Sequence, residues 1–192
     1  MQSNKVIMIR SSFKHLLIFS IMILMALFTG SCASSGKVKE KMIVSQVDLN
    51  RYAGKWYEIA RFPHRFEKDL VGVTATYKLL ENGRIEVINR GHKHTLDGPE
   101  KTAVGKAKLA DPAQTGWLKV SFFWIFYADY LILELDTTDY QYALIGSTTD
   151  DYLWVLSRTP QMNQQTYEML LDKAAQRGYD TSRLLLVPQP AE

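Results

Sequence analysis

Segments of alternating apolar and polar residues recur along the middle of the chain. From Val71 to Leu79, valine, alanine, tyrosine and leucine alternate with glycine, threonine and lysine, which is the period of a half-buried strand. Asn82-Gly83 follows, a pair that favours a tight hairpin turn, and the alternation resumes at Ile85 and Val87. Leu118–Phe122 repeats the pattern. These segments predict antiparallel strands joined by short turns.

Polar turns also separate the later segments. The sequences DTTD at 136–139 and STTDD at 147–151 each stand between two apolar runs. The complete pattern predicts eight strands between Ala53 and Arg158. Many short antiparallel strands with polar connections are typical of a sandwich or a barrel, so the sequence predicts an all-β domain.

One late segment has the period of a helix instead. Asn163 can cap its start, and Gly178 can end it in the left-handed conformation. A ninth strand is predicted at Arg183–Val187. The apolar residues of the helix form a single stripe, so we expect the helix to lie against the outside of the sheet; they are Tyr167, Leu170, Leu171, Ala174 and Ala175.

The N-terminal segment has the pattern of a signal peptide. Three basic residues and no acidic ones precede an apolar run of 13 residues, Leu16–Phe28, which is shorter than the roughly 20 residues a membrane-spanning helix needs. The small residues of 29–31 then lead into Cys32 and resemble a bacterial lipobox, although Thr29 replaces the usual leucine. The resemblance implies cleavage before Cys32, a diacylglycerol on its sulfur and an acyl chain such as palmitate on its amine.

This interpretation divides the chain into three parts. Residues 1–31 are the predicted lipoprotein signal peptide, 32–47 a lipidated tether and 48–192 one barrel domain. Cys32 is the only cysteine, which excludes a disulfide within the chain. Removing residues 1–31 takes three of the 23 basic residues, leaving 20 against 20 acidic ones. A neutral mature chain without a basic stripe gives no reason to expect nucleic acid as a partner.

Three motifs resemble the signatures of the lipocalin family, in the family's order. They are GKWYE at 54–58, TTDYQYAL at 137–144 and LSRTP at 156–160. Further stretches, such as YEIARFPHRFE at 57–67, resemble the bacterial outer-membrane lipoprotein lipocalins, on the branch shared with apolipoprotein D. The resemblance runs from about Asn50 to Gln189. It implies an eight-stranded antiparallel up-and-down β-barrel, with one C-terminal helix packed outside and a short ninth strand.

The resemblance also implies roles for the signature residues. Trp56 would close one end of the barrel from inside, with the guanidinium of Arg158 over its indole. The structural signature comprises Gly54, Trp56, Asp139, Tyr140 and Arg158. The implied protein is a lipid-anchored carrier in the bacterial envelope, and Ala33 after the cysteine favours the outer membrane. The implied ligand is a lysophospholipid or a fatty acid, and a homodimer stays open.

If Trp56 points inward, strand parity assigns the lining of a cavity. Glu58 and Ala60 share its face, whereas Arg61 is expected to point outward. On the eighth strand Leu156 shares the parity of Arg158, and family register implies Ile145 on the seventh. The predicted ligand-binding residues are Glu58, Ala60, Val73, Ala75, Tyr77, Val87, Asn89, Leu118, Val120, Phe122, Tyr130, Ile132, Tyr152 and Trp154.

Three points stay open at the level of sequence. Glu58 is either a structural acid bonded to a tyrosine or a ligand contact. On the sixth strand the leucines of 131–135 form the more apolar face, while family register places Tyr130, Ile132 and Glu134 inside. The loop 123–127 is aromatic and has no turn former; it either contacts a membrane or ligand, or folds back as a lid.

Enzymatic alternatives find little support in the sequence. His92 and His94 share a strand face, but two ligands do not make a metal site, so we expect no metal. We also expect no cofactor and no catalytic residue. Two hypotheses compete with a binding protein: a lipocalin-shaped enzyme that uses Glu58 or Tyr152, and a barrel filled by its own side chains. Glu58→Gln would abolish turnover in the first, and a bulky residue at Ala75 would cost stability in the second.

Overall fold

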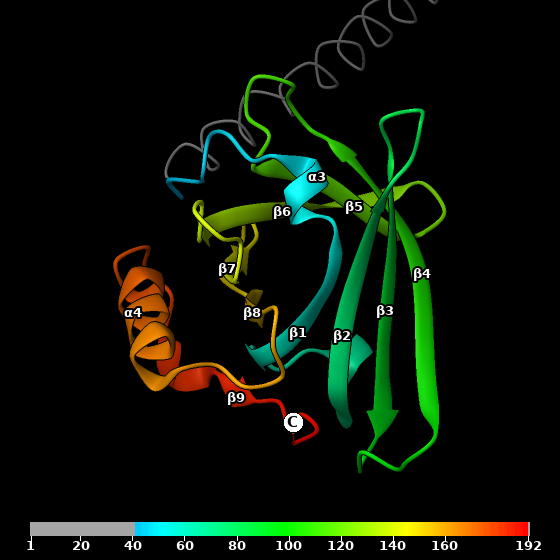
Figure 1. The fold of residues 1–192 in the computed structure, drawn as a ribbon, viewed down its shortest axis with the longest axis vertical. Coiled ribbons are helices and arrows are strands. Elements are labelled where there is room, and N and C mark those ends of the chain that lie inside the picture. The colour runs from blue at the N-terminus through cyan, green and yellow to red at the C-terminus, as the bar shows by residue number, and fades with distance from the viewer. Residues whose placement is uncertain (1–40, 192) are drawn as a thin grey trace, which may run out of the picture. The chain divides into compact units, whose positions relative to one another are not determined.

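The computed structural model describes residues 41–191, which form one closed antiparallel barrel (Figure 1). Each strand pairs with the next along the chain, and β1 pairs with both β2 and β8, so no edge of the eight-stranded sheet is left open. The predicted fold is therefore confirmed. The strands are β1 Gly54–Arg61, β2 Leu70–Leu79, β3 Ile85–Lys93, β4 Glu100–Leu109, β5 Trp117–Phe123, β6 Phe126–Leu135, β7 Tyr142–Gly146 and β8 Leu153–Ser157.

Short helices and a ninth strand complete the domain. They are α3 Leu49–Tyr52, η1 Arg65–Glu67, α4 Gln164–Ala175, η2 Thr181–Arg183 and β9 Leu185–Leu186. Asn163 caps α4 by accepting hydrogen bonds from the first-turn amides, and Gly178 follows the helix at φ +83°, as its sequence predicts. β9 pairs with β1 and is shorter than the expected 183–187 strand.

The helix α4 lies outside the barrel. Leu170 and Ala174 on its apolar stripe are fully buried. Just beyond its end, Arg177 donates hydrogen bonds to the backbone oxygen of Leu133 at 2.9 Å and to the carboxylate of Glu134 at 2.7 Å. Because both acceptors belong to β6, these contacts fix the end of the helix to the outer face of the sheet.

One end of the barrel is closed by packed side chains. Trp56 is fully buried and donates its indole N–H to the backbone oxygen of Tyr52 in α3 at 2.8 Å. The guanidinium of Arg158 lies 3.8 Å from the centre of the Trp56 ring. Gly54 beside this guanidinium adopts φ +94°, a backbone conformation in which any other residue would be strained. The hydroxyl of Tyr140 accepts a hydrogen bond from the backbone N–H of Asp48.

The compact domain begins before the predicted boundary at Asp48. The backbone N–H of Val44 donates to Ile132 of β6 at 2.9 Å, and Ser45 accepts from the N–H of Thr115. Val47 is buried in the barrel core. Residues 41–47 are therefore part of the domain and not tether, whereas the predicted signal peptide and Cys32 lie outside the described residues.

Candidate ligand-binding cavity

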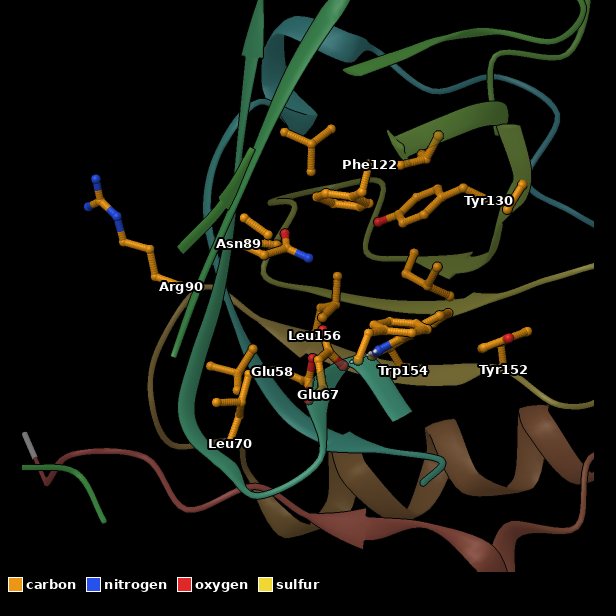
Figure 2. A pocket seen from close by; sticks show the side chains of 18 of the residues that line it. Glu58, Glu67, Leu70, Asn89, Arg90, Phe122, Tyr130, Tyr152, Trp154 and Leu156 are labelled. Carbon is orange, nitrogen blue, oxygen red and sulfur yellow. Dashed lines mark hydrogen bonds between the residues drawn. The ribbon is translucent and has the colours of Figure 1, made fainter. Parts of the chain in front are cut away.

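The barrel encloses a cavity of about 490 Å³ that opens at the end opposite α3. Successive strands are antiparallel, so the β1–β2, β5–β6 and β7–β8 connections share one end of the barrel. Residues in or beside these connections line the cavity: Phe66 lies in the first, Phe123 ends β5 just before the second, and Tyr152 lies in the third. The side chains around the space come from opposite walls of the barrel and converge on it (Figure 2).

The structure brings eleven of the fourteen predicted ligand-binding residues to the wall of this cavity. These positions were assigned mainly by strand parity, although the pairings of β1 with β8, β2 with β3, β5 with β6 and β6 with β7 each shift register once. Their contact with a ligand stays a prediction. The eleven are Glu58, Val73, Ala75, Tyr77, Val87, Asn89, Val120, Phe122, Tyr130, Tyr152 and Trp154.

Ala60 does not lie on the cavity, because a β-bulge interrupts β1. Glu58 pairs with Leu156 of β8, but Ala60 pairs with Val155 and Arg61 with Trp154, so the register shifts by one residue between them. The extra residue reverses the parity of the strand. Ala60 is consequently buried on the outer face, and Arg61, expected to point outward, is buried beside Glu58 instead.

Leu118 and Ile132 point inward as expected but lie below the cavity. Both are fully buried in the cluster that packs around Trp56 at the closed end. Parity gives the face of a strand and not the depth along the barrel axis, so it could not separate these two from the lining. On β6, Tyr130 and Ile132 face inward, and a register shift after Ile132 turns Glu134 outward and Leu135 inward.

Sequence reasoning missed much of the mouth. Ala103 in β4 alternates in side-chain size with Thr102 and Val104, and this period-two signal could have assigned the fourth strand. The irregular β1–β2 connection carried no such signal. The missed lining residues are Phe66, Glu67, Leu70, Arg90, Lys101, Thr102, Ala103, Phe123, Phe126, Ala128, Asp129 and Ser147.

A buried charged network forms one side of the cavity. Nη1 of Arg61 donates to the carboxylate of Glu58 at 2.6 Å, and its other amino group donates to the backbone oxygens of Glu67 and Leu70. A carboxylate oxygen of Glu67 lies 3.9 Å from Arg61 and 2.8 Å from Nε2 of His64. Glu58 is thus a structural acid, although its partner is an arginine and not a tyrosine, and it lines the cavity as well.

Two carboxylates share one guanidinium in this network. Burial, followed by the negative charge of Glu67, raises the pKa of Glu58 well above its ordinary value, although Arg61 opposes the shift. Figure 2 shows Glu58, Glu67 and Trp154 gathered on the same side of the space. The indole N–H of Trp154 donates to Glu67 at 3.3 Å. Glu58 therefore keeps its proton to higher pH than an exposed glutamate does.

Three tyrosine hydroxyls form a chain at the deep end of the cavity. The hydroxyl of Tyr130 lies 2.6 Å from that of Tyr52 and 2.8 Å from that of Tyr77. Burial raises the pKa of all three, so each keeps its proton at neutral pH. Since each hydroxyl is both donor and acceptor, the three groups satisfy one another without a charge.

Two further polar groups face the space. The side-chain oxygen of Asn89 is buried on the cavity wall, and no donor among residues 41–191 reaches it (Figure 2). Lys101 lines the mouth on β4, opposite Gly91 of β3. The side chain of Arg90, although it borders the mouth, points away from the interior. The cavity thus combines an apolar wall with one unpaired acceptor and one cation at its entrance.

The described residues do not provide a set of metal ligands. No group of three or more histidine, cysteine, aspartate or glutamate residues suited to a metal ion occurs at 41–191. In the same range, no helix combines the length and the apolar character that crossing a membrane requires.

A closed barrel with one packed end, one open end and an apolar cavity between them has the architecture of a barrel that can hold one small ligand. The comparison with family models agrees, because the model described as a lipocalin-like domain matches residues 47–189. The chain therefore belongs to the lipocalin-like family, as its three motifs indicate.

Named relatives have closely similar sequences. Outer membrane lipoprotein Blc of Vibrio cholerae is 44% identical over 146 residues, covering 76% of this chain and 85% of the relative. Mouse apolipoprotein D is 34% identical over 163 residues, covering 80% and 83%. Insecticyanin from the tobacco hornworm superposes with a TM-score of 0.62 at 20% identity, covering 78% of this chain and 84% of that structure, which supports the fold alone.

Proposed function

We propose that this protein binds one lipophilic molecule with a single acyl chain, a lysophospholipid or a fatty acid, and stores or transports it in the barrel cavity. The cavity itself is the observation that carries the proposal. Its volume of about 490 Å³ falls within the roughly 300–1,000 Å³ typical of small-molecule sites. A barrel filled by its own side chains would leave no such space.

The wall of the cavity favours an amphiphile in a defined orientation. Val87, Val120 and Ile145 offer apolar surface toward the closed end, where an acyl chain would lose contact with water. Lys101 lies at the mouth, where a phosphate or carboxylate group could pair with it and stay solvated. The ligand would therefore enter chain first and keep its head group at the open end.

The charged network argues against a carboxylate deep in the barrel. Glu58 and Glu67 already share Arg61, so another buried anion beside them would lack a cation. A head group at the mouth avoids this cost. The same network gives Glu58 a structural partner in the guanidinium of Arg61.

The cellular setting of the proposal rests on sequence. The lipobox-like segment before Cys32 indicates lipid attachment at that cysteine. Relatives that cover most of the chain are named outer membrane lipoproteins. We therefore place the protein in a bacterial outer membrane, held by its acylated N-terminus, with the barrel acting on lipids of the envelope.

Native mass spectrometry tests the proposal directly. A soluble variant that starts at Ala33 keeps all of residues 41–192, and it would be purified without detergent and then denatured to release its contents. A single class of single-chain lipid bound at one copy per protein is the expected result. A protein that is folded by circular dichroism, empty, and unable to take up added lysophospholipid or fatty acid would rule the proposal out.

A further inference from the structure

The hairpin between β5 and β6 presents four consecutive apolar side chains to solvent. Phe123 and Trp124 are each 77% exposed, Ile125 is 62% exposed and Phe126 is 70% exposed. Scattered exposed apolar residues are ordinary, but a contiguous group of this size marks a contact surface. We call residues 122–126 the aromatic hairpin.

The turn geometry holds the tip of the aromatic hairpin away from the barrel. Phe123 pairs with Phe126 across the two strands, so only Trp124 and Ile125 form the connection. Trp124 adopts φ +50°, a conformation that a bulky residue adopts at a cost. A glycine would make this turn more easily, so turn formation does not explain a tryptophan here. We therefore expect the exposed indole of Trp124 to contact a surface outside the barrel.

The surroundings of the aromatic hairpin are cationic. Trp124 borders a shallow hollow with Val104 and Lys106 of β4. The ammonium groups of Lys106 and Lys108 lie 5.8 and 5.0 Å from the ring centre of Tyr127. The acid nearest in sequence, Asp129, is already paired with Lys119 at 2.6 Å. Lysines beside exposed aromatic and aliphatic side chains match the interface of an anionic lipid bilayer.

We infer that the aromatic hairpin docks the open end of the barrel on a membrane surface containing anionic lipids, with Trp124 and Ile125 inserted at the level of the acyl chains. The contact is additional to the anchor at Cys32. A second copy of this chain fits the surface less well. A symmetric pair would bring Lys106 and Lys108 of both copies into one interface, where their like charges repel.

The docked orientation connects the bilayer with the cavity. Phe123 and Phe126 line the mouth, whereas Trp124 and Ile125 do not border the cavity. The inner residues of the aromatic hairpin would thus form an apolar path from the membrane to the barrel interior, and the outer residues would hold the protein there. A lipid could move along this path without exposing its chain to water.

Quenching of tryptophan fluorescence by brominated lipids tests the inference. The full, lipidated protein would be reconstituted in phosphatidylcholine vesicles with and without phosphatidylglycerol, with ordinary or brominated acyl chains. The Trp124→Phe variant isolates the signal of Trp124 from those of the other three tryptophans. Strong quenching of the Trp124 signal in vesicles with phosphatidylglycerol is expected. Its absence would overturn the inference, since the anchor already holds the protein at the membrane.

Matched variants separate docking from general surface effects. Ile125→Ser should lower the ratio of docked to undocked protein about tenfold, because the isoleucine no longer inserts. Leu186→Ser on β9 removes an aliphatic side chain of similar exposure, 69%, and should change nothing. Replacing Lys106 and Lys108 by glutamine should lower the ratio of docked to undocked protein about fivefold for each charge removed. This loss should occur only in vesicles that contain phosphatidylglycerol.

Two outcomes separate membrane docking from an interface between copies and from the carrier function. Trp124 fluorescence that is not quenched by brominated lipids but changes with the surface density of the protein would identify an interface between copies and overturn docking. Uptake of monomeric lysophospholipid by Ile125→Ser in solution should equal that of the unmodified protein, because Ile125 does not line the cavity. An empty cavity together with quenched Trp124 would refute the proposed carrier function and leave the docking surface standing.

Discussion

The guanidinium of Arg158 lies 3.8 Å above the indole of Trp56 and is hydrogen-bonded to the backbone of three separate segments. It donates to the oxygen of Arg51 at 2.7 Å, of Lys55 at 2.8 Å and of Tyr140 at 3.1 Å. One side chain thus joins α3, β1 and the β6–β7 connection at the closed end of the barrel.

Replacing Arg158 by lysine should lower the free energy of unfolding by about 2 kcal/mol. A single ammonium cannot reach three carbonyl groups and also lie flat on the indole. Urea denaturation would measure the loss. Arg183→Lys is the matched control, because the guanidinium of Arg183 lies 4.6 Å from the centre of the Phe62 ring but makes, within residues 41–191, a single hydrogen bond of 3.5 Å. Equal losses in the two variants would contradict the role assigned to Arg158.

The closed end was predictable from sequence because its motifs carry fixed spacings. Trp56 and Arg158 specify which faces of β1 and β8 point inward, and antiparallel pairing extends that choice to the other strands. The limit of this reasoning is visible on β1. The bulge after Glu58 exchanges the faces of Ala60 and Arg61, and no residue in GKWYEIARF signals it. Its cause is tertiary, since Arg61 is held by Glu58, Glu67 and Leu70.

The sequence also did not predict how far each inward-facing residue lies along the barrel axis. Leu118 and Val120 share the inner face of β5, yet the first packs around Trp56 and the second lines the cavity. Which of them meets a ligand depends on how far Tyr52 and its neighbours fill the closed end. That is a property of the assembled core and not of any one strand.

A bulky residue at Ala75 should block the cavity with little loss of stability. Ala75 lines the cavity, where the indole of Ala75→Trp can fill existing space, so binding of lysophospholipid or fatty acid should disappear. Ala107 is a matched position, inward-facing and 1% exposed, but in the packed cluster. Ala107→Trp should lower the free energy of unfolding by about 1–3 kcal/mol, because overpacking forces neighbours apart.

Thermal unfolding and ligand titration of both variants would separate the two effects. A large loss of stability in Ala75→Trp, as large as in Ala107→Trp, would show that the space closes in solution and that the barrel is filled. Retained binding in a stable Ala75→Trp protein would place the ligand elsewhere.

The raised pKa of Glu58 predicts a pH-dependent stability difference between the protein and Glu58→Gln. Burial and the charge of Glu67 make folded Glu58 hold its proton to higher pH than the unfolded chain does, with Arg61 opposing this. The contribution of Glu58 is therefore present below its ordinary pKa of 4.5 and is lost as the pH rises through the folded value. Glutamine cannot ionise, so the variant should gain stability relative to the unmodified protein over that range.

Urea denaturation at successive pH values measures this difference. The difference in the free energy of unfolding between the two proteins should change by no more than about 1.4 kcal/mol per pH unit, the limit for one proton. Comparing the two proteins at each pH cancels the titration of groups that do not interact with Glu58. A difference that stays flat, or one that favours Glu58 as the pH rises, would contradict the raised pKa.

The unpaired oxygen of Asn89 predicts a change of ligand selectivity in Asn89→Leu. A buried acceptor without a donor costs about 1–3 kcal/mol, so leucine of similar shape should leave the free protein equally or more stable. A lysophospholipid carries a hydroxyl that can donate to Asn89, whereas an ionised fatty acid has no donor. The variant should therefore bind lysophospholipid several-fold more weakly, by the loss of one hydrogen bond, and bind fatty acid unchanged or more tightly. Calorimetric titration with the two ligands measures the ratio of affinities, and equal changes for both would show that Asn89 lines the cavity without selecting its contents.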